Sequence, residues 1–370
     1  MQNTHKRWII LIVSVLFIKI FSLFPDAVEQ YYSRGLYPYI AEFFRLLFGW
    51  VPFSVGDILY FIAGAVIAGK LIDFIIQLVR RRITKQIVWK KLKRFVAFLL
   101  IVYIVFNIFW GLNYNRVPLA KQLHLSRQEY STPELSGLVQ LLTDSLNAIA
   151  AYVRDDRMFD ERPLFKKAVV AYAIGGKREP LLYYPYRSIK SSLYDRLLNY
   201  TGVSGYYNPF TGEAQVNTAM PGFVQPFVTC HEIGHQVGYA KEDEANFAGF
   251  LAAHAHPDTI FRYAAWFEMY AYARRELYLR DSINAKGIYQ RLHPGVRADF
   301  RYMKRFYEKY ENPIEPFITK IYAQYLKVNQ QPRGMNTYNE VVAMLVAWYK
   351  KQGYYLQERT VAYSRPIEER

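Results

Sequence analysis

Residues 58–112 read ILYFIAGAVIAGKLIDFIIQLV, RRRITKQIVWKKLKR and FVAFLLIVYIVFNIFWGL, so two apolar runs flank a basic segment. About 20 apolar helical residues cross the roughly 30 Å hydrocarbon core of a bilayer. The runs 58–79 and 95–112 therefore have the lengths of membrane spans. The segment 80–94 carries eight Lys and Arg residues and no acidic residue. Such clusters concentrate in cytoplasmic loops, so we expect this segment to be cytoplasmic.

A third apolar run, residues 8–24, follows Lys6 and Arg7 near the N-terminus. No small-residue cleavage site follows it, so we interpret it as a retained anchor and not as a signal peptide. Residues 25–57 contain two basic and four acidic residues together with many aromatic ones, which predicts an outward loop at the membrane interface. The sequence thus predicts a three-helix transmembrane anchor, residues 1–112, in the cytoplasmic membrane. The N-terminus is then cytoplasmic, and residues 113–370 form an extracytoplasmic (periplasmic) domain.

The composition excludes several classes of protein. The chain has 370 residues, of which 52% are hydrophobic and 17% aromatic, and its formal net charge is +16. These values exclude a disordered chain, a collagen-like fibre and, with Cys230 as the single cysteine, a disulfide scaffold. The basic residues of the first 112 positions lie beside apolar runs instead of along one polar face. We therefore expect the lipid bilayer as a partner and no nucleic acid.

The domain 113–370 alternates helical patterns with turn signals. Ser131 and Glu134 have the spacing of a capping box that begins a helix. Further helices are expected at 260–280, 296–310, 316–325 and 338–351. A strand is expected at 166–173, and a hairpin within 202–217 around a Pro- and Gly-containing turn. The fold class predicted for this domain is mainly α with a small β element.

The chemistry is concentrated in residues 231–235, which read His-Glu-Ile-Gly-His. Two histidines one helical turn apart can each give an imidazole nitrogen to one zinc ion, as in the HExxH motif. Zinc lowers the pKa of a water at its open position toward neutrality, and Glu232 can accept the proton of that water. The pattern therefore predicts one Zn²⁺ per chain, held by His231 and His235, with Glu232 as the catalytic base.

A third zinc ligand is expected just downstream. Gly238 can end the first helix, and a second one opens near Lys241. Glu242 and Asn246 are four residues apart, so Glu242 can complete the ligand set while the Asn246 amide orients a liganding histidine. Glu244 points about 200° away from Glu242 around a helix and stays the alternative ligand, because the helix start is uncertain.

Other polar groups near the motif can also be assigned roles. His254 and His256 are interpreted as polar groups at a helix end, in preference to a second metal site. A strand edge beside a zinc helix can bind a peptide by adding a strand, and this role is predicted for Ala214, Gln215, Val216 and Asn217. An ordinary structural hairpin is the equally weighted alternative. Tyr338 is the candidate donor that stabilises an oxyanion.

The motifs also resemble a known family. The runs 205–217, 230–239 and 242–247, together with Pro-Phe-Ser-Val-Gly-Asp at 52–57, resemble an uncharacterised bacterial membrane family catalogued as domain of unknown function 3810. The resemblance covers most of the chain and implies a multi-span anchor followed by an α+β zincin-like metallopeptidase domain. The Glu-x-x-Ala-Asn pattern at 242–246 is similar to the ligand helix of gluzincin-like membrane peptidases, which implies Glu242 as the third ligand. Only six residues separate His235 from Glu242, fewer than in most zincins with a glutamate ligand.

These observations predict an enzyme: a membrane-anchored zinc metallopeptidase that hydrolyses peptide or protein substrates outside the cytoplasm. Two alternatives stay open. One is a zinc hydrolase of cell-wall peptides or small amides, since the same activated water attacks any polarised carbonyl. The other is a non-catalytic structural or signalling membrane protein. The sequence leaves the substrate and the oligomeric state open.

Overall fold

The computed structural model describes residues 2–82, 84–125, 129–153, 161–328, 338–354 and 356. The described chain is mainly helical and has one small sheet, as the sequence predicts. In chain order the elements are α1 (Gln2–Phe21), α2 (Pro25–Ala27), the π-helix η1 (Val28–Leu36), α3 (Tyr37–Phe48), α4 (Val55–Val79), α5 (Lys85–Phe109), η2 (Gly111–Asn115), α6 (Leu119–Gln122), α7 (Thr132–Ile149), α8 (Glu161–Arg178), η3 (Pro180–Leu182), β1 (Ile189–Ser191), α9 (Asp195–Asn199), β2 (Gly205–Asn208), β3 (Glu213–Val216), η4 (Gly222–Val224), α10 (Gln225–Gln236), α11 (Glu242–Ala255), α12 (Thr259–Arg280), α13 (Ser282–Gln290), α14 (Pro294–Tyr310), α15 (Glu315–Val328) and α16 (Tyr338–Lys351).

Two helices, α4 and α5, are long and apolar enough to cross a membrane. A third candidate is α1 if it is counted together with residues 25–48, from which it is separated by a bend of 102°. These apolar helices indicate association with a membrane. The basic segment 80–94 is mostly helical, because α5 begins at Lys85 with Thr84 as its N-cap and meets no helix breaker. Its positive charges therefore lie largely on the first turns of α5.

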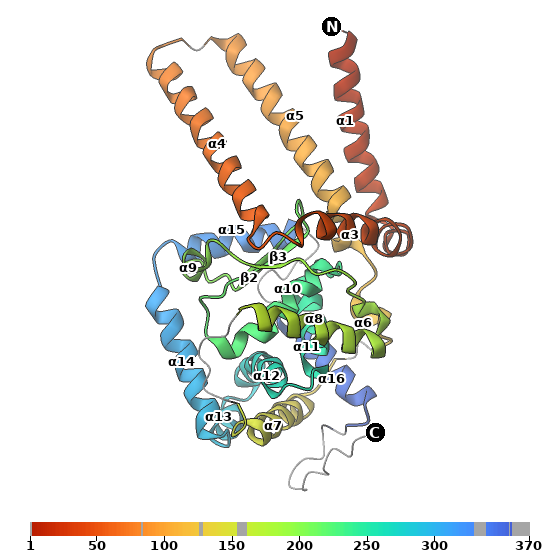
Figure 1. Cartoon of the computed structure of the whole chain (residues 1–370), viewed down its shortest axis with the longest axis vertical. Coiled ribbons are helices and arrows are strands. Elements are labelled where there is room, and N and C mark those ends of the chain that lie inside the picture. The colour runs from red at the N-terminus through yellow and green to blue at the C-terminus, as the bar shows by residue number, and fades with distance from the viewer. Residues whose placement is uncertain are drawn as a thin grey trace.

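The three apolar helices project from one side of the domain, and α3 lies across their base (Figure 1). A small core joins this region to the domain. Its members come from α1, η1, α3, the end of α5 and η2, and from two positions of the domain: Ile18, Val28, Tyr32, Tyr37, Ala41, Trp110, Leu112, Tyr114, Tyr207 and Ala240. The anchor and the domain are therefore packed together and not merely tethered.

The main core of the domain lies among α7, α8, α10, α11, α12 and α16. The helix α7 begins with the predicted capping box of Ser131 and Glu134. The prediction of a strand at 166–173 is wrong, because these residues lie within α8. The buried positions of α8, Leu164, Ala168, Ala171 and Tyr172, recur at intervals of three and four, which is the period of one helix face.

The sheet has the strand order β1-β3-β2. The hairpin predicted within 202–217 is confirmed, since β2 and β3 pair antiparallel with Gly205 opposite Val216. The expected free edge at Ala214–Asn217 is wrong, because β1 pairs in parallel with the other side of β3. Ala214, Gln215, Val216 and Asn217 are all buried. On this side of the sheet, the edge strand is β2.

Candidate metal centre

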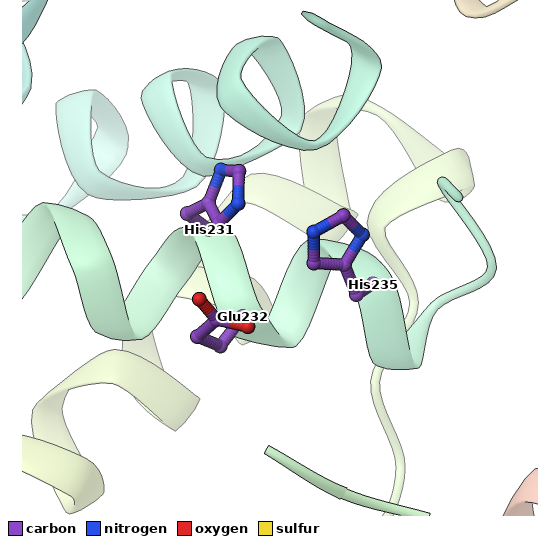
Figure 2. Close-up of side chains that lie close together, drawn as sticks. All are labelled: His231, Glu232 and His235. Atoms are coloured by element: carbon purple, nitrogen blue, oxygen red, sulfur yellow. The ribbon is translucent and has the colours of Figure 1, made fainter. Parts of the chain in front are cut away.

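The His-Glu-Ile-Gly-His motif lies in the second half of α10, with Pro226 in the first turn of that helix. The helix ends where Gly238 adopts a φ of +97°, a left-handed conformation that glycine allows without steric cost. The rings of His231 and His235 are 4.7 Å apart. Figure 2 shows both imidazoles on one side of α10 and Glu232 on another. All twelve residues of α10 are buried, so the histidines lie in the interior of the domain.

Two glycines allow α11 to cross α10 closely. A Cβ atom on Gly234 would lie 3.2 Å from the backbone oxygen of Ala245, and one on Gly249 would lie 2.9 Å from the backbone nitrogen of His231. At this crossing the carboxylate of Glu242 approaches both histidines from α11. Its Oε2 lies 3.4 Å from Nε2 of His231, and its Oε1 lies 3.8 Å from Nε2 of His235.

This donor set suits a zinc ion. Nitrogen and oxygen ligands about 2.0–2.2 Å from a tetrahedral zinc are roughly 3.3–3.5 Å from one another. The spacing of 3.4 Å between Glu242 and His231 is in that range, and the spacing to His235 is slightly longer. The Nδ1 atom of His235 lies 2.7 Å from the backbone oxygen of Tyr239, which leaves its Nε2 for a metal. His231, His235 and Glu242 could therefore hold the ion.

Glu232 also lies within ligand distance, since its carboxylate and the two imidazoles each offer an atom within 4.8 Å of the others. Its side chain leaves α10 in a different direction from that of His231, because neighbouring helix positions are about 100° apart. Its Oε2 is buried and has no hydrogen-bond partner among the described residues. A Cβ atom on Gly205 of β2 would lie 2.6 Å from the other carboxylate oxygen, Oε1. Glu232 therefore lies between the two histidines and the edge strand β2.

The charges of the cluster are strongly coupled. Burial lowers the pKa of His231, but the hydrogen bond to Glu242 and the charges of both glutamates outweigh burial and raise it above the ordinary value. Burial lowers the pKa of His235 to about 4. Burial raises the pKa of Glu232 to about 8, against the opposing effect of His231. The carboxylates thus draw positive charge into the cluster, either as protons or as a cation.

The two remaining residues of the predicted ligand helix take different positions. Asn246 lies close enough to His231 to raise the pKa of that histidine, but His231 Nδ1, the atom that an orienting group would contact, has no hydrogen-bond partner among the described residues. Glu244 is turned elsewhere: its Oε1 accepts a hydrogen bond from the backbone N–H of Leu119, and it lies 3.9 Å from Lys241. The structure therefore brings Glu242, and not the alternative Glu244, to the histidines.

Other predicted groups lie outside the cluster. His254 stacks on Phe250 and contacts two tryptophans, while His256 Nδ1 accepts a hydrogen bond from the backbone of Asp258. Among the described residues, neither belongs to a group that could hold a metal. Tyr338 begins α16, and its side chain lies outside the described part of the chain.

Sequence reasoning missed a third carboxylate near the histidines, Glu268 of α12. Burial raises its pKa to about 7, while the nearby His231 acts to lower it. Glu268 is 26 positions beyond Glu242 in a long helix, and no motif marks it. Sequence reasoning also missed the role of Gly205, because no local sequence pattern marks a glycine that packs against a side chain from another element.

The comparisons with known proteins give one match. The family described as "Protein of unknown function (DUF3810)" matches residues 32–346, a range that begins in η1 and ends in α16. No curated protein and no solved structure matches the chain. Because the matched range covers most of the residues and includes the whole His-Glu-His cluster, the chain belongs to the DUF3810 family.

Proposed function

We propose that the protein is a multi-pass membrane zinc metallopeptidase whose catalytic domain lies on the outer face of the cytoplasmic membrane. The observation that carries this proposal is the position of Glu242. Its carboxylate comes from a different helix and lies 3.4 and 3.8 Å from the Nε2 atoms of both HExxH histidines. Two imidazoles and one carboxylate that leave a further position open form the ligand set of many catalytic zinc sites.

Each residue has a chemical role in this proposal. His231, His235 and Glu242 would hold the zinc, which when bound polarises the scissile carbonyl and makes water nucleophilic at neutral pH. Glu232 Oε2 accepts the proton of the attacking water and later delivers it to the leaving amine. This oxygen is available for proton transfer because no group in the described part of the chain hydrogen-bonds to it. Asn246, which lies close enough to raise the pKa of His231, is the proposed orienting group for that ring.

The edge strand β2 offers a place for an extended peptide. The backbone N–H of Asn217 donates to the backbone oxygen of Ser204 at 3.0 Å, so Ser204 faces β3. Because backbone groups alternate along a strand, the N–H and carbonyl of Gly205 face the free edge. Gly205 also lies against Glu232. A peptide that adds to β2 as a further strand would therefore pass beside the proposed base.

The basic residues at 80–94 support the proposed orientation. They lie at the ends of α4 and α5 farthest from the domain, and clusters of Lys and Arg remain cytoplasmic (Figure 1). Single cysteines at Arg81 and Gly287, in a Cys230→Ser background, would test it with a membrane-impermeant maleimide on intact spheroplasts. We expect labelling at Gly287→Cys and none at Arg81→Cys until the membrane is opened. The reverse pattern would place the domain in the cytoplasm.

The enzyme proposal is tested by zinc content and by hydrolysis of a peptide library. We expect the detergent-purified wild type and Glu232→Gln to hold about one zinc per chain, and Glu242→Gln to lose most of it. Hydrolysis by Glu232→Gln should fall by about 10²-fold or more, the usual contribution of a general base. Glu244→Gln is the matched control on α11 and should retain zinc. A wild type that holds no zinc after reconstitution would refute the proposal.

A further inference from the structure

The C-terminal end of α10, the helix that carries His231 and His235, is bound by residues of the membrane anchor and of the segment just after it. Trp110 follows the last residue of α5, and its Nε1 donates to the backbone oxygen of His235 at 3.1 Å. The Tyr37 hydroxyl donates to the backbone oxygen of Gln236 at 2.8 Å, and Arg116 donates to that of Gly238 at 3.1 Å. The last carbonyls of a helix have no partner within the helix. Here Trp110 and Tyr37 of the anchor supply partners for the last two carbonyls of α10, and Arg116, four residues beyond the anchor, supplies one for Gly238 just after the helix.

The edge strand is attached to the anchor as well. The Tyr206 hydroxyl donates to the carboxylate of Asp57 in the first turn of α4, and the Tyr206 and Tyr60 rings are 6.4 Å apart. The backbone N–H of Gly56 donates to Glu213 of β3 at 2.6 Å. A Cβ atom on Gly56 would lie 2.4 Å from the Asn208 side-chain amide, so a larger residue would require that amide to move. The helix α10 and the edge strand β2 are thus both attached to ends of apolar helices.

The helix α3 has the features of a segment that lies at a bilayer surface. Its inner face, with Tyr37, Ala41 and Arg45, is buried on the domain. On its outer face Tyr39 is 73% and Phe43 is 60% exposed. The chain reaches α3 from α1 and leaves it for α4, both of which project from the same side of the domain (Figure 1). A helix with one apolar exposed face between two apolar helices has the pattern of an interfacial segment.

The His-Glu-His cluster therefore lies close to the ends of the apolar helices. The Trp110 ring is 6.0 Å from the His235 ring and 5.2 Å from the ring of Tyr207 in β2. Tryptophan at the end of a membrane helix commonly lies at headgroup level. An extended chain covers about 3.3 Å per residue, so a short segment outside the bilayer would reach a site at this height.

We propose that the substrate is itself anchored in the membrane and is cleaved within the first few residues outside the bilayer. This inference rests on the proposed peptidase function. Confinement to the same membrane raises the effective concentration of a short tethered segment, in the way that a linker does for two binding modules. A site attached to α4 and α5 at both of its sides keeps a fixed height above the bilayer, so cleavage depends on distance from the membrane.

The test has two stages and uses the full-length protein. In the first, detergent-purified wild type and Glu232→Gln digest a mixed-sequence peptide library, and mass spectrometry identifies the bond that only the wild type cleaves. In the second, this sequence is placed in a quenched fluorescent reporter behind a single transmembrane helix, with spacers of about 4, 8 and 30 residues. Enzyme and reporter are reconstituted in the same vesicles, with the unanchored peptide as the control.

We expect the reporters with the two short spacers to be cleaved at least about tenfold faster than the long-spacer reporter and the free peptide at equal total concentration. Equal rates for all spacers, with the library bond cleaved, would overturn the inference and leave the peptidase function standing. Absence of any wild-type-specific cleavage in the first stage would count against the peptidase function itself.

Discussion

Substitution of Gly249 by alanine tests whether the close crossing of α10 and α11 positions the carboxylate of Glu242. The added Cβ would lie 2.9 Å from the backbone nitrogen of His231 and 3.0 Å from its Cα, whereas ordinary contact begins at 3.4 Å. Both obstructing atoms belong to backbone, so α11 must move by about 0.5 Å. Metal sites tolerate deviations of only about 0.2 Å in ligand distance.

We therefore expect zinc affinity to fall by about 10- to 100-fold, the usual effect of a displaced supporting group. Overpacking of this kind costs about 1–3 kcal/mol of folding stability, of which the better helix propensity of alanine offsets up to about 1 kcal/mol. The assay is a competition titration with a chromophoric zinc chelator, together with thermal unfolding in the same detergent.

Gly287→Ala is the matched control, because Gly287 also lies in a helix and a Cβ there would meet no atom within 4 Å. It should leave zinc affinity unchanged. If folded Gly249→Ala bound zinc within about twofold of the wild type, the reasoning would be refuted: either α11 does not carry a ligand or the crossing does not set its position.

Three further predictions follow from other contacts. Gly205→Ala places a methyl group 2.6 Å from Glu232 Oε1 and 2.7 Å from the Gln215 backbone oxygen. We therefore expect peptide hydrolysis to fall by about 10²-fold while zinc content is retained. Unchanged hydrolysis would contradict the proposed position of Glu232 as the base. Burial, reinforced by neighbouring arginines, lowers the pKa of His254 from 6.5 to about 4, so between these values the unfolded state binds a proton that the folded state does not. The unfolding free energy should therefore decrease as the pH falls, by up to about 1.4 kcal/mol per pH unit, and His254→Phe should show a flatter dependence of melting temperature on pH. Glu213→Gln replaces a carboxylate that accepts hydrogen bonds from the first two backbone amides of α4. We expect the free energy of unfolding, measured with denaturant, to fall by about 1–2 kcal/mol. A variant as stable as the wild type would show that this cap contributes nothing.

Much of the local structure could be predicted from the sequence, because its signals act over a few residues. The capping box at Ser131 begins α7, and Gly238, in a left-handed conformation, ends α10, as the sequence predicts. The apolar runs correspond to long helices, and the spacing of His231 and His235 already places both on one helix face. These features follow from helix periodicity and from side-chain hydrogen bonds within one turn.

Where local patterns were ambiguous, tertiary contacts decided the outcome. Residues 166–173 contain two adjacent valines and predict a strand, yet they form part of α8 because one face of that helix packs against α11. The central position of β3 depends on pairing with β1, whose residues lie more than twenty positions earlier in the chain. Strand order depends on such distant pairings, and the sequence of the hairpin does not indicate them.

The sequence by itself determined the helical class, the apolar helices and the motif residues His231, Glu232 and His235, because each depends on residue type and short-range spacing. Only the tertiary structure decided which of Glu242 and Glu244 approaches the histidines, since a helix start shifted by one residue rotates both by about 100°. The hydrogen bonds of Trp110 and Tyr37 to the end of α10 were likewise visible only in the tertiary structure. These contacts join residues more than a hundred positions apart, and packing alone brings them together.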